Sequence, residues 1–295
     1  MAAEVLSQDY IVSKLDELPT LPTVVYELSR VINDPMSSTA EVERIMSSDQ
    51  SLTTKVLKLV NSAYYAIPGG VSNLSRAIAF IGFDTVNQLV LSSSILKALE
   101  IKGPVHFDVN EFWKHSLGVA IAAETIAEFT RHPNPPDLFT SGLVHDMGKI
   151  ALYVVHEEGM MSIIKNAEEK KISYYESEGQ LELPRHTTLG YLLAQKWILP
   201  TQIMAVIKYH HQKDPQLRGG LSSDLNNCVD IVYLANLLIH ALKFGNSGHQ
   251  VILGAPKEVL GRLTIDPDKG FKKLLLDIKS NLDAAHELIR LLIGE

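Results

Sequence analysis

The sequence has little cysteine, no long uninterrupted apolar run and no surplus of basic residues, and each shortage excludes a class of protein. Cys228 is the single cysteine among 295 residues, so no disulfide forms within the chain, and we expect a reducing, cytoplasmic location. Polar residues interrupt the most apolar stretch, residues 86–99, and residues 1–10 lack the pattern of a signal peptide. We therefore expect a soluble protein without a membrane span. The net charge of -7 argues against general nucleic-acid binding.

Helical periodicity, in contrast, runs along almost the whole chain. Apolar residues recur at spacings of three and four, as in Val24, Leu28 and Val31, and no run alternates in the manner of a strand. Ser38 followed by Glu41 is typical of a capping box at a helix start. The sequence therefore predicts an all-α fold.

Two helical units are expected within this fold. Residues 1–105 are predicted to form an N-terminal helical bundle, and residues 106–295 a second helical domain with a C-terminal helical extension. The boundary is placed in residues 101–110, where glycine and proline interrupt the helical pattern. Residues 212–221 form the longest polar connection, and we expect a mobile loop over a site there.

Histidine and carboxylate residues gather at predicted helix ends. Seven of them are candidate metal ligands: Glu111, His115, His145, Asp146, His186, His210 and His211. Glu111 and His115 are four residues apart, which places them on one face of a helix. A set of imidazole and carboxylate ligands without thiolate suits Fe, Mn, Zn or Co, and a pair of such ions suits hydrolysis of phosphate esters.

Each candidate also has an ordinary structural explanation. Glu111 is a favourable carboxylate for the first turn of a helix, and His210 and His211 favour a helix C-terminus. His115 taken alone is more often a hydrogen-bonded core or surface group, and His186 is equally explained as a substitute N-cap. The residues indicate a metal site jointly, through the order in which they occur, and not singly.

That order resembles the HDOD domain of the HD superfamily of metal-dependent phosphohydrolases, from Leu18 to about His211. The matching segments are Leu18–Pro22, Leu52–Ala63, Ala77–Gly82, Trp113–Ser116, Gly142–Lys149, His186–Gly190 and Trp197–Pro200. The resemblance implies an N-terminal helical bundle packed on an HD-like helical domain. It also implies a bacterial signalling role that is regulatory and not catalytic.

Comparison with the HD-GYP branch, which degrades cyclic di-GMP at a multi-metal centre, carries the ligand positions over onto all seven candidates. Lys149 matches the lysine that contacts the scissile phosphate in that branch. Two departures weaken a catalytic interpretation. Asn236 stands where the HD pattern closes with an aspartate, and its neutral amide oxygen is a weaker ligand than a carboxylate. Residues 212–220 also lack the Gly-Tyr-Pro signature of cyclic di-GMP recognition.

Three hypotheses follow, in order of preference. The first is a signal-transduction protein that contacts partner signalling proteins and retains one or two divalent ions, Fe or Mn, with Zn as the alternative. The second is an active phosphohydrolase on a nucleotide or other phosphate ester, in which Asp146 and the histidines hold metal and Lys149 offsets phosphoryl charge. The third is a structural metal site that pins helix ends together.

Overall fold

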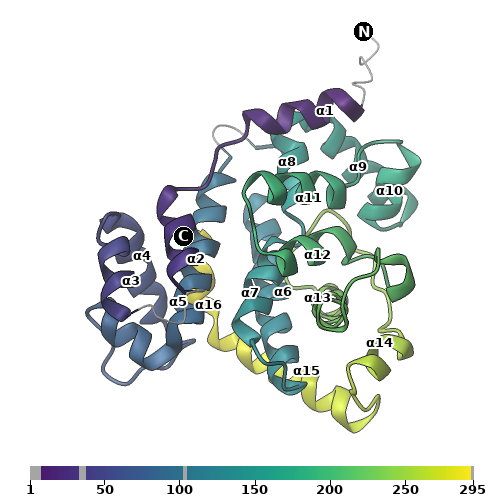
Figure 1. Ribbon diagram of the computed structural model, residues 1–295. Coiled ribbons are helices and arrows are strands. Elements are labelled where there is room, and N and C mark those ends of the chain that lie inside the picture. Colours follow the sequence, from purple (N-terminus) through teal and green to yellow (C-terminus); the bar gives the residue numbers. More distant parts are fainter. Residues whose placement is uncertain (1–7, 33–37, 102–104, 294–295) are drawn as a thin grey trace.

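The computed structural model describes residues 8–32, 38–101 and 105–293, which form helices joined by turns and loops (Figure 1). These ranges contain no strand, so the predicted all-α fold is confirmed. In the N-terminal part the elements are α1 (Gln8–Lys14), η1 (Leu15–Glu17), α2 (Thr23–Ile32), α3 (Thr39–Met46), α4 (Gln50–Val60) and α5 (Leu74–Ala98).

The remaining elements make up the larger part of the molecule. They are α6 (Val109–Phe129), α7 (Pro135–Val144), α8 (Met147–Val155), α9 (Glu157–Lys170), α10 (Tyr174–Gln180), α11 (His186–Lys196), α12 (Thr201–Tyr209), η2 (Pro215–Leu217), α13 (Ser223–Leu242), α14 (Lys257–Arg262), α15 (Lys269–Ala284) and α16 (His286–Ile293). Apolar side chains from all parts of the described chain join in one continuous core.

Local sequence signals explain where helices begin and bend. The capping box predicted at Ser38 is present: its hydroxyl accepts a hydrogen bond from the Glu41 amide at 3.4 Å, and the Glu41 carboxylate accepts one from the Ser38 amide at 3.1 Å. Gly82 interrupts α5 with φ 80° and ψ 166°. Glycine is the residue that adopts this conformation without steric cost, so α5 is kinked at this position.

Two glycines permit close contacts between helices in the interior of the molecule. A Cβ atom at Gly142 in α7 would lie 2.8 Å from the Ala120 Cα atom in α6. A Cβ atom at Gly148 in α8 would lie 1.9 Å from the carbonyl oxygen of His186, the first residue of α11. Larger residues would push these helices apart. The glycines therefore bring α6, α7, α8 and α11 close around one point.

Both ends of the described chain pack across the predicted domain boundary. The Lys196 ammonium in α11 donates hydrogen bonds to the carbonyls of Leu15 at 3.0 Å and Asp16 at 2.8 Å. At the other end, α16 packs against α4, α5 and α6, and the Glu287 carboxylate accepts a hydrogen bond from the Ala63 amide at 3.1 Å. Residues 102–104 of the expected boundary stretch lie outside the described residues, and the division at residue 105 stays a prediction.

Two helices, α5 and α13, are long and apolar enough to cross a membrane, judged by length and composition alone. Their apolar windows are 56% and 61% buried inside the fold. Burial of this kind is typical of core helices in a soluble protein.

Candidate metal centre

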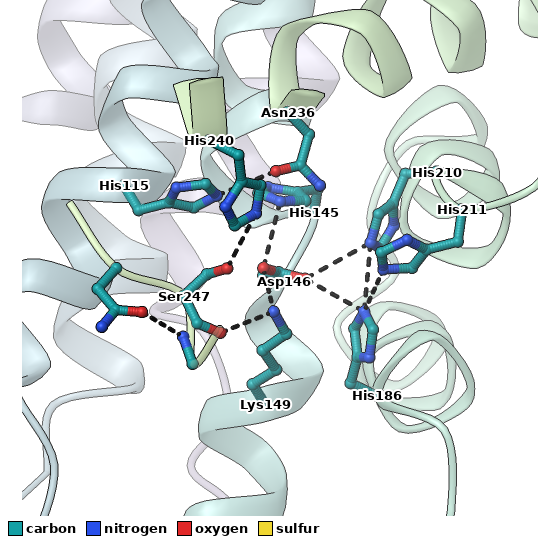
Figure 2. Close-up of polar contacts among 12 residues, drawn as sticks. His115, His145, Asp146, Lys149, His186, His210, His211, Asn236, His240 and Ser247 are labelled. Atoms are coloured by element: carbon teal, nitrogen blue, oxygen red, sulfur yellow. Dashed lines mark hydrogen bonds and ion pairs between the residues drawn. The ribbon is translucent and has the colours of Figure 1, made fainter. Parts of the chain in front are cut away.

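His145 and Asp146 form the turn between α7 and α8, and both side chains point into the interior (Figure 2). They are 0% and 1% exposed. His145 Nδ1 donates a hydrogen bond of 2.7 Å to the carbonyl of Gly142, which fixes the ring with Nε2 toward the cluster. Nε2 has no hydrogen-bond partner in the described chain and lies 3.3 Å from Asp146 Oδ2. The turn thus places an imidazole lone pair beside a carboxylate.

Asp146 and three histidines form the first group of potential ligands. His186 begins α11, and His210 and His211 follow the last residue of α12. The Nε2 atoms of His210 and His211 each lie 3.2 Å from His186 Nε2. Asp146 Oδ1 lies 3.1 Å from His186 Nε2 and 3.5 Å from His210 Nε2. Such separations match ligand atoms around one ion with bonds of about 2 Å.

A second group shares Asp146 with the first and adds His115 from α6 and His145. His115 is 0% exposed, and its Nδ1 has no hydrogen-bond partner in the described chain. Its Nε2 lies 3.0 Å from Oδ1 of Asn236 in α13. Since Asp146 belongs to both groups, its carboxylate lies between two potential metal positions (Figure 2).

The contacts on the far side of the imidazole rings show that this donor set fits a metal. His210 Nδ1 donates to the Ile207 carbonyl at 3.0 Å, and His186 Nδ1 donates to the Glu178 carboxylate at 2.9 Å. Metal-binding histidines make this kind of hydrogen bond through their second nitrogen. A neutral ring that donates through Nδ1 has only an acceptor at Nε2, so the facing Nε2 atoms lack protons to share. A divalent cation supplies the partner that these lone pairs need.

Electrostatics favour the metal-binding protonation states of Asp146, His210 and His211. At His186 burial lowers the pKa, but the Glu178 and Asp146 carboxylates outweigh burial and raise it above its usual value. Burial lowers the pKa of His210 to about 4 and holds the pKa of His211 well below its usual value. Burial opposes ionisation of Asp146, but the neighbouring His145 ring and Lys149 ammonium outweigh burial and hold the carboxyl pKa well below its ordinary range. Neutral imidazole and ionised carboxylate are the forms that bind metal.

Lys149 is buried beside the cluster, as its predicted role near the metal requires, but its ammonium is already engaged. It is 2% exposed and donates hydrogen bonds to Asp146 Oδ2 at 2.6 Å and to the Ser247 carbonyl at 2.9 Å. The ammonium also lies 4.5 Å from the centre of the Tyr174 ring. Lys149 therefore balances the charge of Asp146 in this structure.

Glu111 is the one predicted ligand that the structure leaves away from the cluster. Its side chain is 40% exposed, and its carboxylate accepts a hydrogen bond of 2.9 Å from Lys114. His115, one turn further along α6, is fully buried. The Glu111 carbonyl accepts a hydrogen bond from the Asn246 amide at 2.9 Å, so its backbone touches the wall of the site while its carboxylate faces solvent.

The structure adds site residues that the sequence did not reveal. Glu178 is 0% exposed and orients His186. The His240 ring lies 4.5 Å from that of His115, and His249 stacks on His240 at 4.2 Å. Burial lowers the pKa of His240 to about 4 and that of His249 to about 2. A signal was available for His240, which follows Asn236 by four residues in α13 and so shares its helix face. His249 lies in an irregular segment, where no helical spacing places it.

The cluster is closed off from solvent. All but one of the grouped ligands are at most 1% exposed: His115, His145, Asp146, His186 and His210. His211 is partly buried, and its ring stacks on Tyr175 at 4.6 Å between ring centres. His211 therefore marks the side of the cluster that is nearest to the surface.

An all-helical fold around a buried cluster of histidines and one aspartate agrees with the expected resemblance to the HD superfamily. The family model described as HDOD domain matches residues 18–213, and the chain belongs to this family. The match confirms the resemblance expected from Leu18 to about His211. It includes every predicted ligand except Asn236.

Solved structures of similar proteins share the fold. An HDOD domain protein of unknown function from Geobacter sulfurreducens is 24% identical, with a TM-score of 0.74 and coverage of 98% of this chain and 99% of that one. A candidate phosphohydrolase from Shewanella amazonensis is 21% identical, with a TM-score of 0.71 and coverage of 97% and 98%. A candidate signal transduction protein from Marinobacter aquaeolei is 18% identical, with a TM-score of 0.76 and coverage of 98% and 63%.

An uncharacterized protein from Treponema pallidum is 22% identical over 275 residues. The match covers 93% of this chain and 51% of that protein, so the chain spans about half the length of this relative.

Proposed function

We propose that this chain is a bacterial, cytoplasmic signalling protein that retains one or two divalent ions in the cluster and acts through contacts with partner signalling proteins. The observation that carries the proposal is the convergence of imidazole nitrogens and one carboxylate in the interior of the fold. His186, His210, His211 and Asp146 would hold one ion, and His115 and His145 with Asp146 the second position. The imidazole and carboxylate donors suit Fe or Mn, with Zn as the alternative.

The surroundings of the cluster favour regulation over catalysis. A substrate phosphate needs a path to the metal and a free cationic group beside it. Here the ligands are buried, and the Lys149 ammonium already bonds to Asp146 and the Ser247 carbonyl. Residues 212–220 also lack the cyclic di-GMP signature. These features support a centre that stabilises a signalling conformation.

Metal analysis of the full chain tests the proposal. Protein purified without chelator or nickel affinity is expected to contain Fe, Mn or Zn at one or two equivalents, and the Asp146→Ala variant is expected to lose it. His106→Ala is the matched control, because His106 is 67% exposed and pairs with Glu157, and neither residue belongs to the two ligand groups. Metal-free protein with the same melting temperature before and after supply of Fe, Mn and Zn would overturn the metal centre.

The shared position of Asp146 favours a second candidate, a metal-dependent phosphohydrolase on a nucleotide or other phosphate ester. Ions bound on both sides of one carboxylate would supply Lewis-acid polarisation of a phosphoryl oxygen. Asp146 would hold them, and Lys149 would turn from Asp146 toward the phosphate. Turnover of nucleotide or phosphodiester substrates with Mn or Fe, abolished in a folded Lys149→Met variant that keeps its metal, would establish this activity. Metal-loaded protein without turnover supports the regulator.

A further inference from the structure

A pocket with both polar and apolar lining residues lies between the N-terminal helices and the rest of the molecule, and none of the candidate metal ligands lines it. Its volume is about 470 Å³, and α4, α5, α6 and α16 all contribute to its lining. Sites for small organic molecules typically measure about 300–1,000 Å³. The pocket is therefore of the size that one small molecule fills.

Two serines on α5 line the pocket, and their buried hydroxyls have no hydrogen-bond partner in the described chain. Ser93 and Ser94 are both 3% exposed, and the Oγ atoms of both are unpartnered. Helical serines often bond to the carbonyl four residues before, but neither of these does. The preceding residue, Ser92, does find a partner and lies 3.2 Å from the Thr140 hydroxyl. Buried hydroxyls without partners are costly, and rotation of these side chains about χ1 toward the pocket would give both hydroxyls the acceptor oxygens of a ligand as partners.

Lys55 on α4 supplies a partly buried positive charge to the same pocket. Its ammonium contacts the Leu292 carbonyl at 3.4 Å, and no carboxylate in the described residues lies within 4.0 Å of it. Burial and the charge of Lys97, which also lines the pocket, lower the Lys55 pKa. Of the two acids in the lining, Asp49 caps α4 by accepting from the Leu52 amide at 2.9 Å, and Glu100 is exposed.

We propose that this pocket binds a small organic anion, whose carboxylate or phosphate group contacts Lys55, Ser93 and Ser94. The apolar body of the ligand would lie against Trp113 of α6 and Leu52 of α4, which also line the pocket. Because the lining comes from helices on both sides of the junction, binding stabilises the packing of the N-terminal helices on the remainder. The pocket is thus a ligand site independent of the metal centre.

The two tryptophans of the chain provide an internal test. Trp113 lines the pocket, whereas Trp197 is 0% exposed and donates its indole hydrogen bond to the Pro19 carbonyl at 2.9 Å. Phenyl phosphate and benzoate, titrated separately into the ¹⁵N-labelled full chain, are expected to shift the indole resonance of Trp113 and leave that of Trp197 in place. The probe that binds more tightly shows whether the pocket prefers a phosphate or a carboxylate group. Phenol and inorganic phosphate are expected to bind at least about tenfold more weakly, because phenol lacks the anionic group and inorganic phosphate lacks the apolar ring.

Variants decide whether the named residues carry the binding. Lys55→Met is expected to weaken the stronger probe by about tenfold, the loss of one charge-assisted hydrogen bond. Lys58→Met, on the same helix but outside this pocket, is the matched control and should bind as the parent does. The double variant Ser93→Ala with Ser94→Ala keeps the test valid if Lys55→Met does not fold. No response of Trp113 to either anion, equal binding of phenol, or unchanged affinity in both pocket variants overturns the proposal.

Discussion

Helix α13 contributes to two buried polar clusters that differ in how fully their members are paired. Asp230 bonds through Oδ1 to Arg218 Nη2 at 2.6 Å and through Oδ2 to Arg262 Nε at 2.6 Å. Six residues later, Asn236 lies beside the candidate metal cluster, where His145 Nε2, His115 Nδ1 and Asp146 Oδ1 have no hydrogen-bond partner in the described chain. The first cluster is complete in itself, whereas the second has an excess of lone pairs.

This difference separates a structural network from a functional one. Arg218 is 0% exposed and also donates to the carbonyls of Gln212 at 2.8 Å and Asn226 at 3.1 Å, so it anchors residues 212–221 to α13. The anchoring argues against the mobile cover that the polar composition of this connection predicted. Buried polar groups are normally satisfied, and a group of unpaired acceptors that face one another indicates a cation.

The largest effect is expected from breaking the complete network. Asp230→Ala leaves the Arg218 guanidinium buried without its carboxylate, and we expect a loss of about 4 kcal/mol in the free energy of unfolding, measured by urea denaturation. The control is Glu169→Ala in the exposed pair with Lys165, 3.9 Å apart, where the loss should stay below about 0.5 kcal/mol. Equal small losses would show that the network is not structural.

Glu124 offers an intermediate case, a partly buried acid with one good partner. Burial raises its pKa from 4.5 to about 7, although the hydrogen bond from Tyr64 at 2.6 Å opposes the rise. The folded state then holds the proton more tightly than the unfolded state does. Stability from this group is full below pH 4.5 and is lost as the pH rises toward 7, by at most about 3 kcal/mol.

The Glu124→Gln variant should lack this loss. Denaturant midpoints measured between pH 4 and pH 8 are expected to fall less for Glu124→Gln than for the parent, with the gap opening as pH rises. The exposed Glu168→Gln serves as control and should follow the parent. A parallel course of all three curves would show that Glu124 ionises normally.

Gly148→Ala probes the close contact that brings the cluster together. The added Cβ atom would lie 1.9 Å from the His186 carbonyl oxygen, so α8 and α11 must separate, at a cost of about 2 kcal/mol in the free energy of unfolding. The shift also moves His186 away from Asp146, so bound metal should be lost. Gly261→Ala in α14 meets nothing within 4 Å and should be neutral or slightly stabilising. A Gly148→Ala protein with full stability and metal would refute this role of the contact.

The fold and most of the cluster could be predicted from the sequence because their signals are local. Helical spacing defines the elements, and the capping box at Ser38 is read directly from two residues. Whether a side chain is buried in the fold, in contrast, depends on residues that are distant in the sequence. The spacing of Glu111 and His115 places them on one helix face, but packing of residues 245–246 against α6 decides that the histidine is buried and the carboxylate exposed. Glu178 was missed because its role depends on how α10 meets α11.

The smallest structural change with a clear readout is Glu178→Gln. The Glu178 carboxylate accepts from His186 Nδ1 at 2.9 Å and from the His186 amide at 2.6 Å. A glutamine keeps an acceptor of the same size but removes the negative charge that makes the imidazole a stronger ligand. We expect metal affinity, measured by competition with a chelator, to fall about 10- to 100-fold. The free energy of unfolding of the metal-free protein should change little by comparison.

Two control variants distinguish the effect of Glu178 on metal affinity from the effect of the Asp230 network on stability. Glu176→Gln lies on the same helix in a capping box with Ser173 and should leave metal affinity unchanged. Asp230→Asn removes a charge from the complete network and should lower stability while metal affinity stays the same. If Glu178→Gln bound metal as tightly as the parent, His186 would not be a ligand, and its contact with Glu178 would belong with the Asp230 network as a self-sufficient ion pair.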